Sequence, residues 1–517
     1  MSQPVKEVYI CSVQRNVMLT LIAADKHITR EELPIRCVSS NDQSVEKITE
    51  IGFYNAFQTT GECKWTLFIA VCYVTEDIKR FIIEGNRKNN EMAEIPFRHP
   101  VKKRHGVVAC VSPLFAFEKW QLLLSSIEFR IAFGVSMQVY YIGSILTSLM
   151  QILHRYEEMG FVSIEKWSGI DIGGIKSDYD PNLELDFRNQ ASAHTDCLIN
   201  FKESAQFIIF SDPDDMLFPQ LAPTYLAEFQ ALQKFSDAHV FIYERFDVNV
   251  YTGMRVMQRI SEKFSLKNIL TESHFTNKWN YGKWVANPEY IVSAWIHWPG
   301  TVSDKCHIYN VPQQYNVMAH FRKWHYSDEL SKFKNDRVTS REVREDSSYQ
   351  VQFAIFLYFA RFMNSEDLFI VRRALSENIG KECSKTRVLT LLREKKTDMI
   401  LALDFSLKLL LTEEKCDHIQ REFEVRTAAN LSDILPLLAP TEHYYPIIDA
   451  CYKRMFYYVF IVMSCPTPYR CNLEPVKGLH CTNAHTENAH HQLNSEHLYI
   501  HYPIDATFIE STDGCSL

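Results

Sequence analysis

The feature that most constrains the fold is an alternation of strand and helix patterns that begins at His105. VVACVS is typical of a strand, residues 117–133 of a helix closed by Gly134, and MQVYYIG of a second strand. The next helix, over residues 144–160, carries apolar residues at 3.6-residue spacing, and the strand FVSIEKW follows it. This β-α-β-α-β order predicts a parallel sheet covered by helices on both faces, with the ligand crevice beyond the carboxyl ends of the strands.

Two further regions flank this alternation. Residues 1–104 show short β-rich runs such as CKWTLFIAVCYV between polar turns and end in the basic segment RHPVKKRH, which we interpret as a linker. Residues 331–517 begin with charged helical patterns and end in an irregular tail. Because 517 residues exceed one usual domain, we expect a β-rich N-terminal region at 1–104, the α/β domain at 105–330 and a mainly helical C-terminal region at 331–517.

Charge and hydropathy exclude two classes of partner. The chain has 55 Lys and Arg against 63 Asp and Glu, and no basic stripe of the kind that nucleic-acid binding needs. The apolar runs at 353–362 and 456–463 are shorter than the roughly 20 residues that span a bilayer. The apolar stretch at 17–24 fits neither a signal peptide nor an anchor. We therefore expect no nucleic-acid partner and no membrane span.

The most informative stretch is AQFIIFSDPDDMLFP, residues 205–219. An apolar run typical of a buried strand is followed directly by Asp212, Asp214 and Asp215. Carboxylates this close repel one another unless a cation neutralises them, and Mg²⁺ or Mn²⁺ bound through one or two carboxylates plus substrate phosphates meets that need. The spacing puts Asp212 and Asp214 on one side of an extended segment. The same pattern also fits a polar turn whose aspartates cap the next element.

This stretch and several others resemble glycosyltransferase family 92, once catalogued as a domain of unknown function. The acidic motif belongs to a signature at residues 179–219. CVSPLFAFEKW and YEEMGFVSIEKW upstream, GKWVANPE, WIHWP and HFR downstream, and CPTPYRC near the C-terminus are similar to the family's motifs in the same order. The resemblance covers residues 105–330 well and the remainder loosely. The residue inside the acidic motif is commonly aliphatic in the family and is Pro213 here.

The resemblance implies a GT-A fold, which is a Rossmann-like nucleotide-sugar transferase domain. It also implies a metal-dependent, inverting transfer of a hexose, typically galactose from UDP-galactose, to a glycan or glycoprotein acceptor. A Mn²⁺ or Mg²⁺ ion held by Asp212 and Asp214 would stabilise the leaving diphosphate. Family members are membrane-associated in the Golgi, so the secretory pathway is expected, although the family's N-terminal anchor has no counterpart in this sequence.

The same resemblance assigns further site residues. His320 in HFR is expected to complete the metal shell, and Arg322 beside it offers a cation to the donor diphosphate. Lys283 is a second candidate for contact with the donor. A general base must deprotonate the acceptor hydroxyl, and Asp215 and Glu289 are both candidates for it.

Two other functions are compatible with these residues. A catalytically silent family member would bind glycans or partners through the same crevice. A metal-dependent phosphohydrolase would use the acidic cluster to cleave phosphate esters and would need no sugar acceptor.

Histidines and cysteines elsewhere have less specific patterns. His297, near an apolar run, is expected to be structural. Six histidines between 480 and 501 stand beside Cys481 and could bind zinc, but their spacing fits no zinc module and favours an exposed tail. In the secretory pathway, Cys465 and Cys471 are expected to be oxidised, to each other or to partners such as Cys451.

Overall fold

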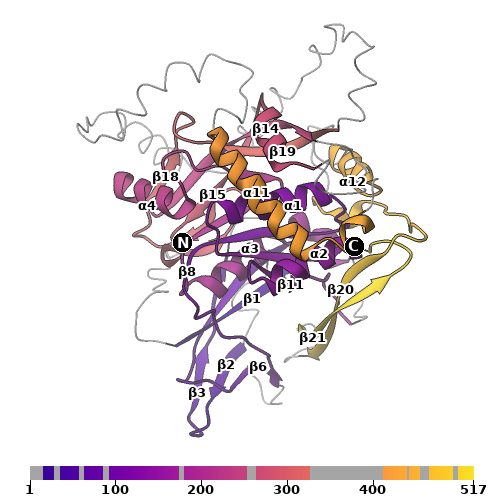
Figure 1. Ribbon diagram of the computed structural model, residues 1–517. Coiled ribbons are helices and arrows are strands. Elements are labelled where there is room, and N and C mark those ends of the chain that lie inside the picture. Colours follow the sequence, from indigo (N-terminus) through magenta and orange to yellow (C-terminus); the bar gives the residue numbers. More distant parts are fainter. Residues whose placement is uncertain are drawn as a thin grey trace.

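A mixed sheet forms the centre of the computed structural model, which describes residues 16–27, 35–56, 63–85, 92–173, 180–252, 264–326, 411–438, 442–454, 465–492 and 499–516. Within these residues the sheet has nine strands in the order β11-β9-β8-β12-β15-β14-β19-β13, and β18 pairs with β14 (Figure 1). The strands are β8 (His105–Leu114), β9 (Met137–Ile142), β11 (Val162–Lys166), β12 (Ala205–Ser211), β13 (Asp215–Leu217), β14 (Val240–Thr252), β15 (His274–Ala286), β18 (Ile308–Val311) and β19 (Met318–Tyr326).

One half of the sheet is parallel, as the sequence predicts. β11, β9, β8 and β12 pair in parallel, because helices return the chain between them. These helices are α1 (Trp120–Ala132), α2 (Thr147–Glu158) and α3 (Gln190–Phe201). In the other half, β15 pairs antiparallel with both β12 and β14, and β13 pairs antiparallel with β19. β14 itself pairs in parallel with β18 and β19. The expectation of a wholly parallel sheet is therefore wrong there, because β15 and β13 run against their neighbours.

Strand β12 is buried on both faces and separates two apolar cores. Phe207 and Ile209 point into the larger core, beneath α1, α2, α4 (Tyr225–Ser236) and α6 (Leu266–Glu272). Ile208 and Phe210 point into the smaller core, where α3 and Trp284 pack. This alternation along one strand explains why the segment shows no polar face in the sequence.

The region before His105 consists of strands, as predicted. β1 (Val17–Asp25), β5 (Trp65–Tyr73) and β4 (Gly52–Asn55) form one sheet. β3 (Glu46–Glu50), β2 (Ile35–Ser40), β6 (Arg80–Gly85) and β7 (Met92–Glu94) form a second. A shared core that includes Cys37, Ala70 and Phe81 joins these two sheets. A short pair, β16 (Ile291–Ala294) and β17 (Pro299–Val302), lies beyond β15 in the chain.

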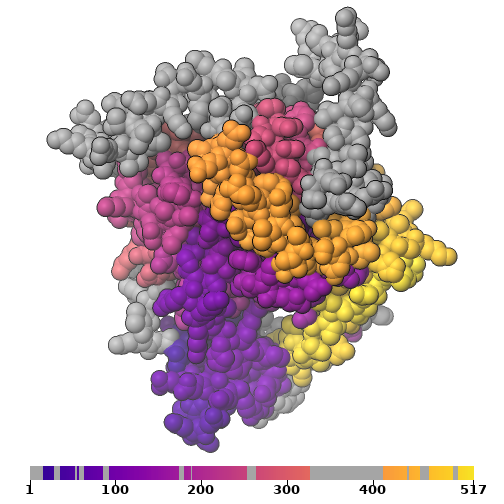
Figure 2. All heavy atoms as spheres, viewed as in Figure 1, coloured from indigo at the N-terminus to yellow at the C-terminus, as the bar shows by residue number. Residues whose placement is uncertain are grey.

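The described residues of the C-terminal region form helices and a strand hairpin. Helix α11 (Glu413–Asn430) lies across the surface of the α/β domain, and α12 (Tyr445–Tyr452) follows (Figure 2). The predicted irregular tail is instead a hairpin of β20 (Cys481–Gln492) and β21 (Tyr499–Ser511), whose first strand pairs with β10 (Ser144–Leu146). β20 is polar and has few β-branched or aromatic residues, whereas β21 is rich in them, so pairing with β21 and β10 decides the conformation of β20. The helices predicted between 341 and 410 lie outside the described residues.

No helix in the described part of the chain is long and apolar enough to cross a membrane. The apolar run at 353–362 and that at 456–463 lie almost entirely outside the described residues.

Ten cysteines of the described residues form five disulfides. These are Cys37–Cys72, Cys63–Cys465, Cys110–Cys197, Cys451–Cys471 and Cys481–Cys515. Cys465 and Cys471 are both oxidised but not to each other, and Cys481 is unavailable as a zinc ligand. Non-reducing peptide mapping should recover Cys63 linked to Cys465 and Cys451 linked to Cys471. Alkylated thiols at Cys465 and Cys471, or a peptide joining these two, would contradict this connectivity.

Glu228 on α4 should make stability depend on pH. Its side chain is buried and accepts hydrogen bonds from the backbone of Gln220 and Leu221 and from Asn316. Burial raises the pKa of Glu228 from 4.5 to about 7. The folded state therefore binds more protons than the unfolded state between these pH values, and stability falls as pH rises through them.

Over that interval this residue should remove about 3 kcal/mol of the free energy of unfolding. Urea unfolding of the wild type and of Glu228→Gln at several pH values measures the effect. As pH rises, the free energy of unfolding of the wild type should fall relative to that of Glu228→Gln. A difference that stays constant with pH would show that Glu228 does not titrate as its burial requires.

Candidate active site

The acidic motif lies where the sequence predicts, directly after the carboxyl end of β12. The backbone N–H of Asp215 donates to the Asp212 carbonyl at 3.2 Å and closes a turn. Asp215 begins β13, whose antiparallel pairing with β19 places it opposite His320. The Phe321 N–H also donates to the Asp214 carbonyl at 2.8 Å. Strand pairing thus brings His320 to the acidic motif.

His320 lies between two carboxylates. Its Nε2 is 3.0 Å from Asp214 Oδ2, and its Nδ1 is 2.7 Å from Asp247 Oδ1. The Asn280 amide donates to the same Asp247 oxygen at 2.6 Å. Burial disfavours the charged ring, but the charge of Asp214 and hydrogen bonds to both carboxylates outweigh it and raise the pKa of His320 to about 9.

This arrangement has the chemistry of a metal ligand set. In metal sites, a ligating histidine usually gives its second ring nitrogen to a carboxylate, which fixes the ring. Asp247 is placed to do this for His320. Ligand atoms of Asp214, Asp215 and His320 all lie within 4.8 Å of one another. Oxygen and imidazole ligands at this spacing suit Mn²⁺ or Mg²⁺.

Buried cations neutralise the other two aspartates. Lys283 Nζ lies 2.8 Å from Asp212 Oδ2, and Arg245 Nη1 lies 3.0 Å from Asp215 Oδ1. The Gln190 amide donates to Asp212 Oδ1 at 2.7 Å. Burial alone would raise the pKa of Asp212, but the charges of Lys283 and Arg245 hold it well below its ordinary value. The protein itself therefore relieves much of the repulsion that the sequence suggested a metal must relieve.

These contacts change two predicted roles. Lys283 is fully buried and also donates to the Ile296 carbonyl at 3.3 Å. It therefore holds Asp212 and does not face a diphosphate. Asp212 lies outside the group of neighbouring metal-ligand atoms, while Asp214 and His320 lie inside it.

Neither predicted general base faces the crevice. The Asp215 side chain has 0% exposure and is bound by Arg245. Glu289 follows β15, whose antiparallel register pairs Ala286 with Ile208 and so carries the chain away from Asp212. Glu289 consequently lies toward the opposite edge of the sheet. Sequence alone did not reveal these placements, because it shows neither the burial of Asp215 nor the direction of the strand before Glu289.

Several residues of the site were not identified from sequence patterns. Arg130 of α1 is buried, and it donates to Ser211 Oγ at 3.2 Å and to the Asp212 carbonyl at 3.1 Å. A signal for it exists, since Arg130 stands between Phe129 and Ile131 in the apolar last turn of α1. Gln190, Arg245, Asp247 and Asn280 were also missed, and no motif marks them. His297 has a structural contact, with its Nδ1 2.8 Å from the Gly282 carbonyl oxygen.

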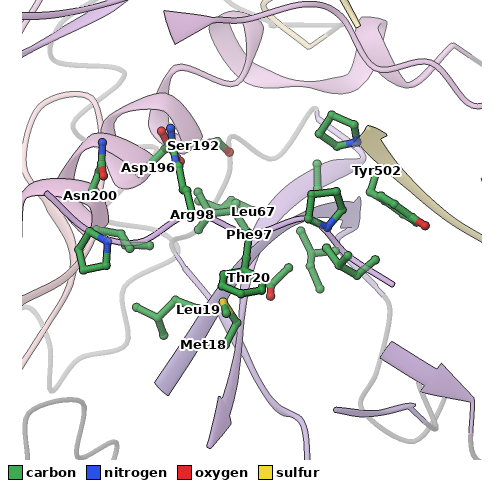
Figure 3. Close-up of a pocket in the computed structure, with 18 of the residues that line it drawn as sticks. Met18, Leu19, Thr20, Leu67, Phe97, Arg98, Ser192, Asp196, Asn200 and Tyr502 are labelled. Carbon is green, nitrogen blue, oxygen red and sulfur yellow. The ribbon is translucent and has the colours of Figure 1, made fainter. Parts of the chain in front are cut away.

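A large cavity lies elsewhere on the molecule. It has a volume of about 2220 Å³ and is lined by β1, the segment around Arg98, α3 and β21 (Figure 3). Arg98 forms an ion pair with Asp196 within it. The cavity reaches Ala205 at the start of β12, whereas Asp212 follows the strand's other end. The cavity therefore lies away from the acidic motif, although it is large.

Comparisons with known proteins agree on one family. A family model for glycosyltransferase family 92 matches residues 105–353. A glycosyltransferase family 92 protein of Caenorhabditis elegans is 30% identical over 460 residues, which are 88% of this chain and 76% of that protein. Another from the same organism is 30% identical over 327 residues, 62% of this chain and 61% of that protein. The solved structure of S. aureus TarS with UDP covers 40% of this chain and 61% of its own, with 10% identity and a TM-score of 0.19, too low to support an inference.

Proposed function

Since this chain belongs to glycosyltransferase family 92 and is a glycosyltransferase, we propose that it moves galactose from UDP-galactose to a glycan acceptor, with inversion. We place the reaction at the crevice beside Asp214 and His320. The observation that carries this placement is the histidine bound between Asp214 and Asp247 at the end of β12. The parallel half of the sheet, with its crevice at the carboxyl ends of the strands, supports a GT-A domain.

We propose that Asp214 and His320 hold a Mn²⁺ or Mg²⁺ ion, with Asp215 close behind them. Such an ion supplies positive charge to the diphosphate leaving group. Asp247 orients the His320 ring and keeps Nε2 directed at the crevice. Lys283 and Gln190 fix the Asp212 carboxylate, which borders the same space and remains a candidate to contact the donor.

Arg322 is proposed to bind the donor diphosphate. Arg322 lies at a bulge of β19, since Phe321 pairs with Val248 and Lys323 with Asn249. Its charge acts on Lys119 and Tyr445 together with that of Asp214, which places it near the crevice. The guanidinium is partly exposed and makes an ion pair with Asp449 at 3.2 Å. Its planar donors suit phosphate oxygens.

The secretory pathway is the compartment we propose, with the Golgi as the site of action. Five disulfides in the described residues support an oxidising compartment. Protein recovered from the cytosol with reduced thiols at these positions would contradict this location.

A screen of nucleotide sugars by thermal shift, with and without Mn²⁺, tests the donor and the metal together. UDP-galactose at 100 times its dissociation constant should add about 2.7 kcal/mol of stability when Mn²⁺ is present. UDP release that requires both donor and acceptor then identifies a transferase. Binding of the donor without UDP release would identify a silent family member. Phosphate release from simple phosphate esters would identify a phosphohydrolase.

A further inference from the structure

Helix α12 lies against the active-site crevice although it is outside the matched family region, which ends at residue 353. The buried Glu118, just before α1, accepts hydrogen bonds from the backbone N–H groups of His443, Tyr444 and Tyr445. One carboxylate therefore fixes the start of α12 to the α/β domain. Asp449, one turn later, reaches Arg322 of β19.

The opposite side of α12 is also anchored. Cys451 is bonded to Cys471, and the Tyr452 ring stacks on Phe187 with ring centroids 6.2 Å apart. Phe187 belongs to the turn that leads into Gln190, the residue bonded to Asp212. Because both sides of the helix are held, Asp449 has a fixed position relative to the acidic motif.

The electrostatics place α12 side chains in the same space as Asp214. Lys119 Nζ lies over the Tyr445 ring, 2.9 Å from its centroid. Burial lowers the pKa of Lys119, and the charges of Glu442, Asp214 and Asp449 oppose that shift. Burial raises the pKa of Tyr445 to about 12, and the nearby Arg322 opposes it. Tyr445 and Asp449 thus border the crevice next to the proposed metal ligand Asp214.

The described carboxylates of the acidic motif are unsuited to remove a proton from an acceptor. Asp212 and Asp215 are bound by buried cations, and Asp247 holds the His320 ring. Asp449 also pairs with two cations, Arg322 at 3.2 Å and Lys453 at 2.7 Å, but these are 35% and 52% exposed, whereas the cations on Asp212 and Asp215 are buried. An incoming acceptor can therefore displace the partners of Asp449 more easily. Glu442 is also partly exposed and lies 3.9 Å from Lys119, but it makes no ion pair with Arg322 among the described contacts.

Building on the proposed function, we propose that α12 forms the acceptor side of the active site, with Asp449 as the general base and Tyr445 as a wall for the acceptor sugar. The acceptor hydroxyl oxygen attacks the anomeric carbon of the donor hexose. The bond from that carbon to the diphosphate oxygen breaks, and its electron pair leaves with UDP. The hydroxyl proton passes to the Asp449 carboxylate. The Tyr445 ring offers an apolar face to the C–H groups of the sugar.

The test compares Asp449→Asn with wild type in two assays. Transfer to the best acceptor found on a glycan array should fall by roughly 10²–10⁴-fold, the range for loss of a general base. UDP affinity in the presence of Mn²⁺, measured by calorimetry, should not fall, because Arg322 keeps its charge and loses only a competing carboxylate. Asp433→Asn is the matched control, since that carboxylate is largely exposed and pairs with Arg155 on α2. It should behave as wild type in both assays.

Two results would overturn the role of Asp449. One is an unchanged transfer rate in Asp449→Asn, and the other is a loss of UDP affinity that parallels the loss of transfer. Tyr445→Leu is a second, independent test of the acceptor side. This variant should raise the KM for the acceptor without changing the affinity for UDP. A wild-type protein that neither binds UDP with Mn²⁺ nor releases it would instead refute the proposed function, and the role of Asp449 with it.

Discussion

Asp214→Asn should reduce sugar transfer by roughly 10³-fold or more while the protein remains folded. The substitution removes the negative charge that faces His320 and that we assign to the metal. A metal ion contributes several kcal/mol to a charged transition state, and each 1.36 kcal/mol is a tenfold change in rate. The fold should survive because the Asp214 side chain is partly exposed and has the same shape as Asn. UDP release from UDP-galactose at saturating Mn²⁺ measures the effect.

Asp237→Asn is the matched control for this variant. Asp237 ends α4 in the left-handed region, with φ 53°, where Asn is well tolerated. Its side chain is 94% exposed and lies 3.8 Å from His307. Transfer by this control should equal that of wild type. Wild-type turnover in Asp214→Asn at saturating Mn²⁺ would show that the metal assignment is wrong.

Arg426→Ala should lower the free energy of unfolding by about 3–5 kcal/mol, the usual cost of leaving one charge of a buried ion pair alone. Arg426 on α11 lies 3.0 Å from Glu128 on α1, and the Glu128 side chain is 1% exposed. Tyr156 also donates to this carboxylate. Burial raises the pKa of Glu128, and the Arg426 guanidinium opposes that shift. Without Arg426, the attachment of α11 to the domain should weaken.

Arg155→Ala tests whether the burial of the Arg426–Glu128 pair is the reason for this large loss of stability. Arg155 on α2 pairs with Glu158 and Asp433, and all three side chains are exposed. Exposed pairs contribute about 1 kcal/mol or less. Urea unfolding should therefore separate the two variants clearly. Equal losses of stability in Arg426→Ala and Arg155→Ala would contradict a special role for the buried pair.

Periodicity made the first half of the central sheet predictable. The apolar run before Asp212 could only be a strand buried on both faces, and its end fixed the place of the acidic motif. The second half, which mixes parallel and antiparallel pairs, was not predictable, because the direction of β15 depends on pairing with β12 rather than on its own residues. The position of Glu289 follows from that direction, since a reversed strand moves the next turn to the opposite end of β12.

Burial and long-range pairing account for the other differences. Lys283 looked like a solvated lysine or a donor ligand, and only the fold shows that it meets Asp212 inside the protein. β20 has a polar sequence, and its pairing with β10 joins segments more than 300 residues apart. No sequence motif marks Asp449 as a site residue, because its position depends on contacts of α12 with β19 and with Glu118.

The most direct test of the account follows the transferred sugar itself. Protein, Mn²⁺, an acceptor from the glycan array and UDP-galactose labelled with ¹³C in the hexose should give a labelled product with the anomeric configuration inverted, as read by NMR. A chelator should stop product formation, and added Mn²⁺ should restore it. Retained configuration, or the same product yield with chelator present, would contradict a metal-dependent inverting transfer at the Asp214 and His320 site.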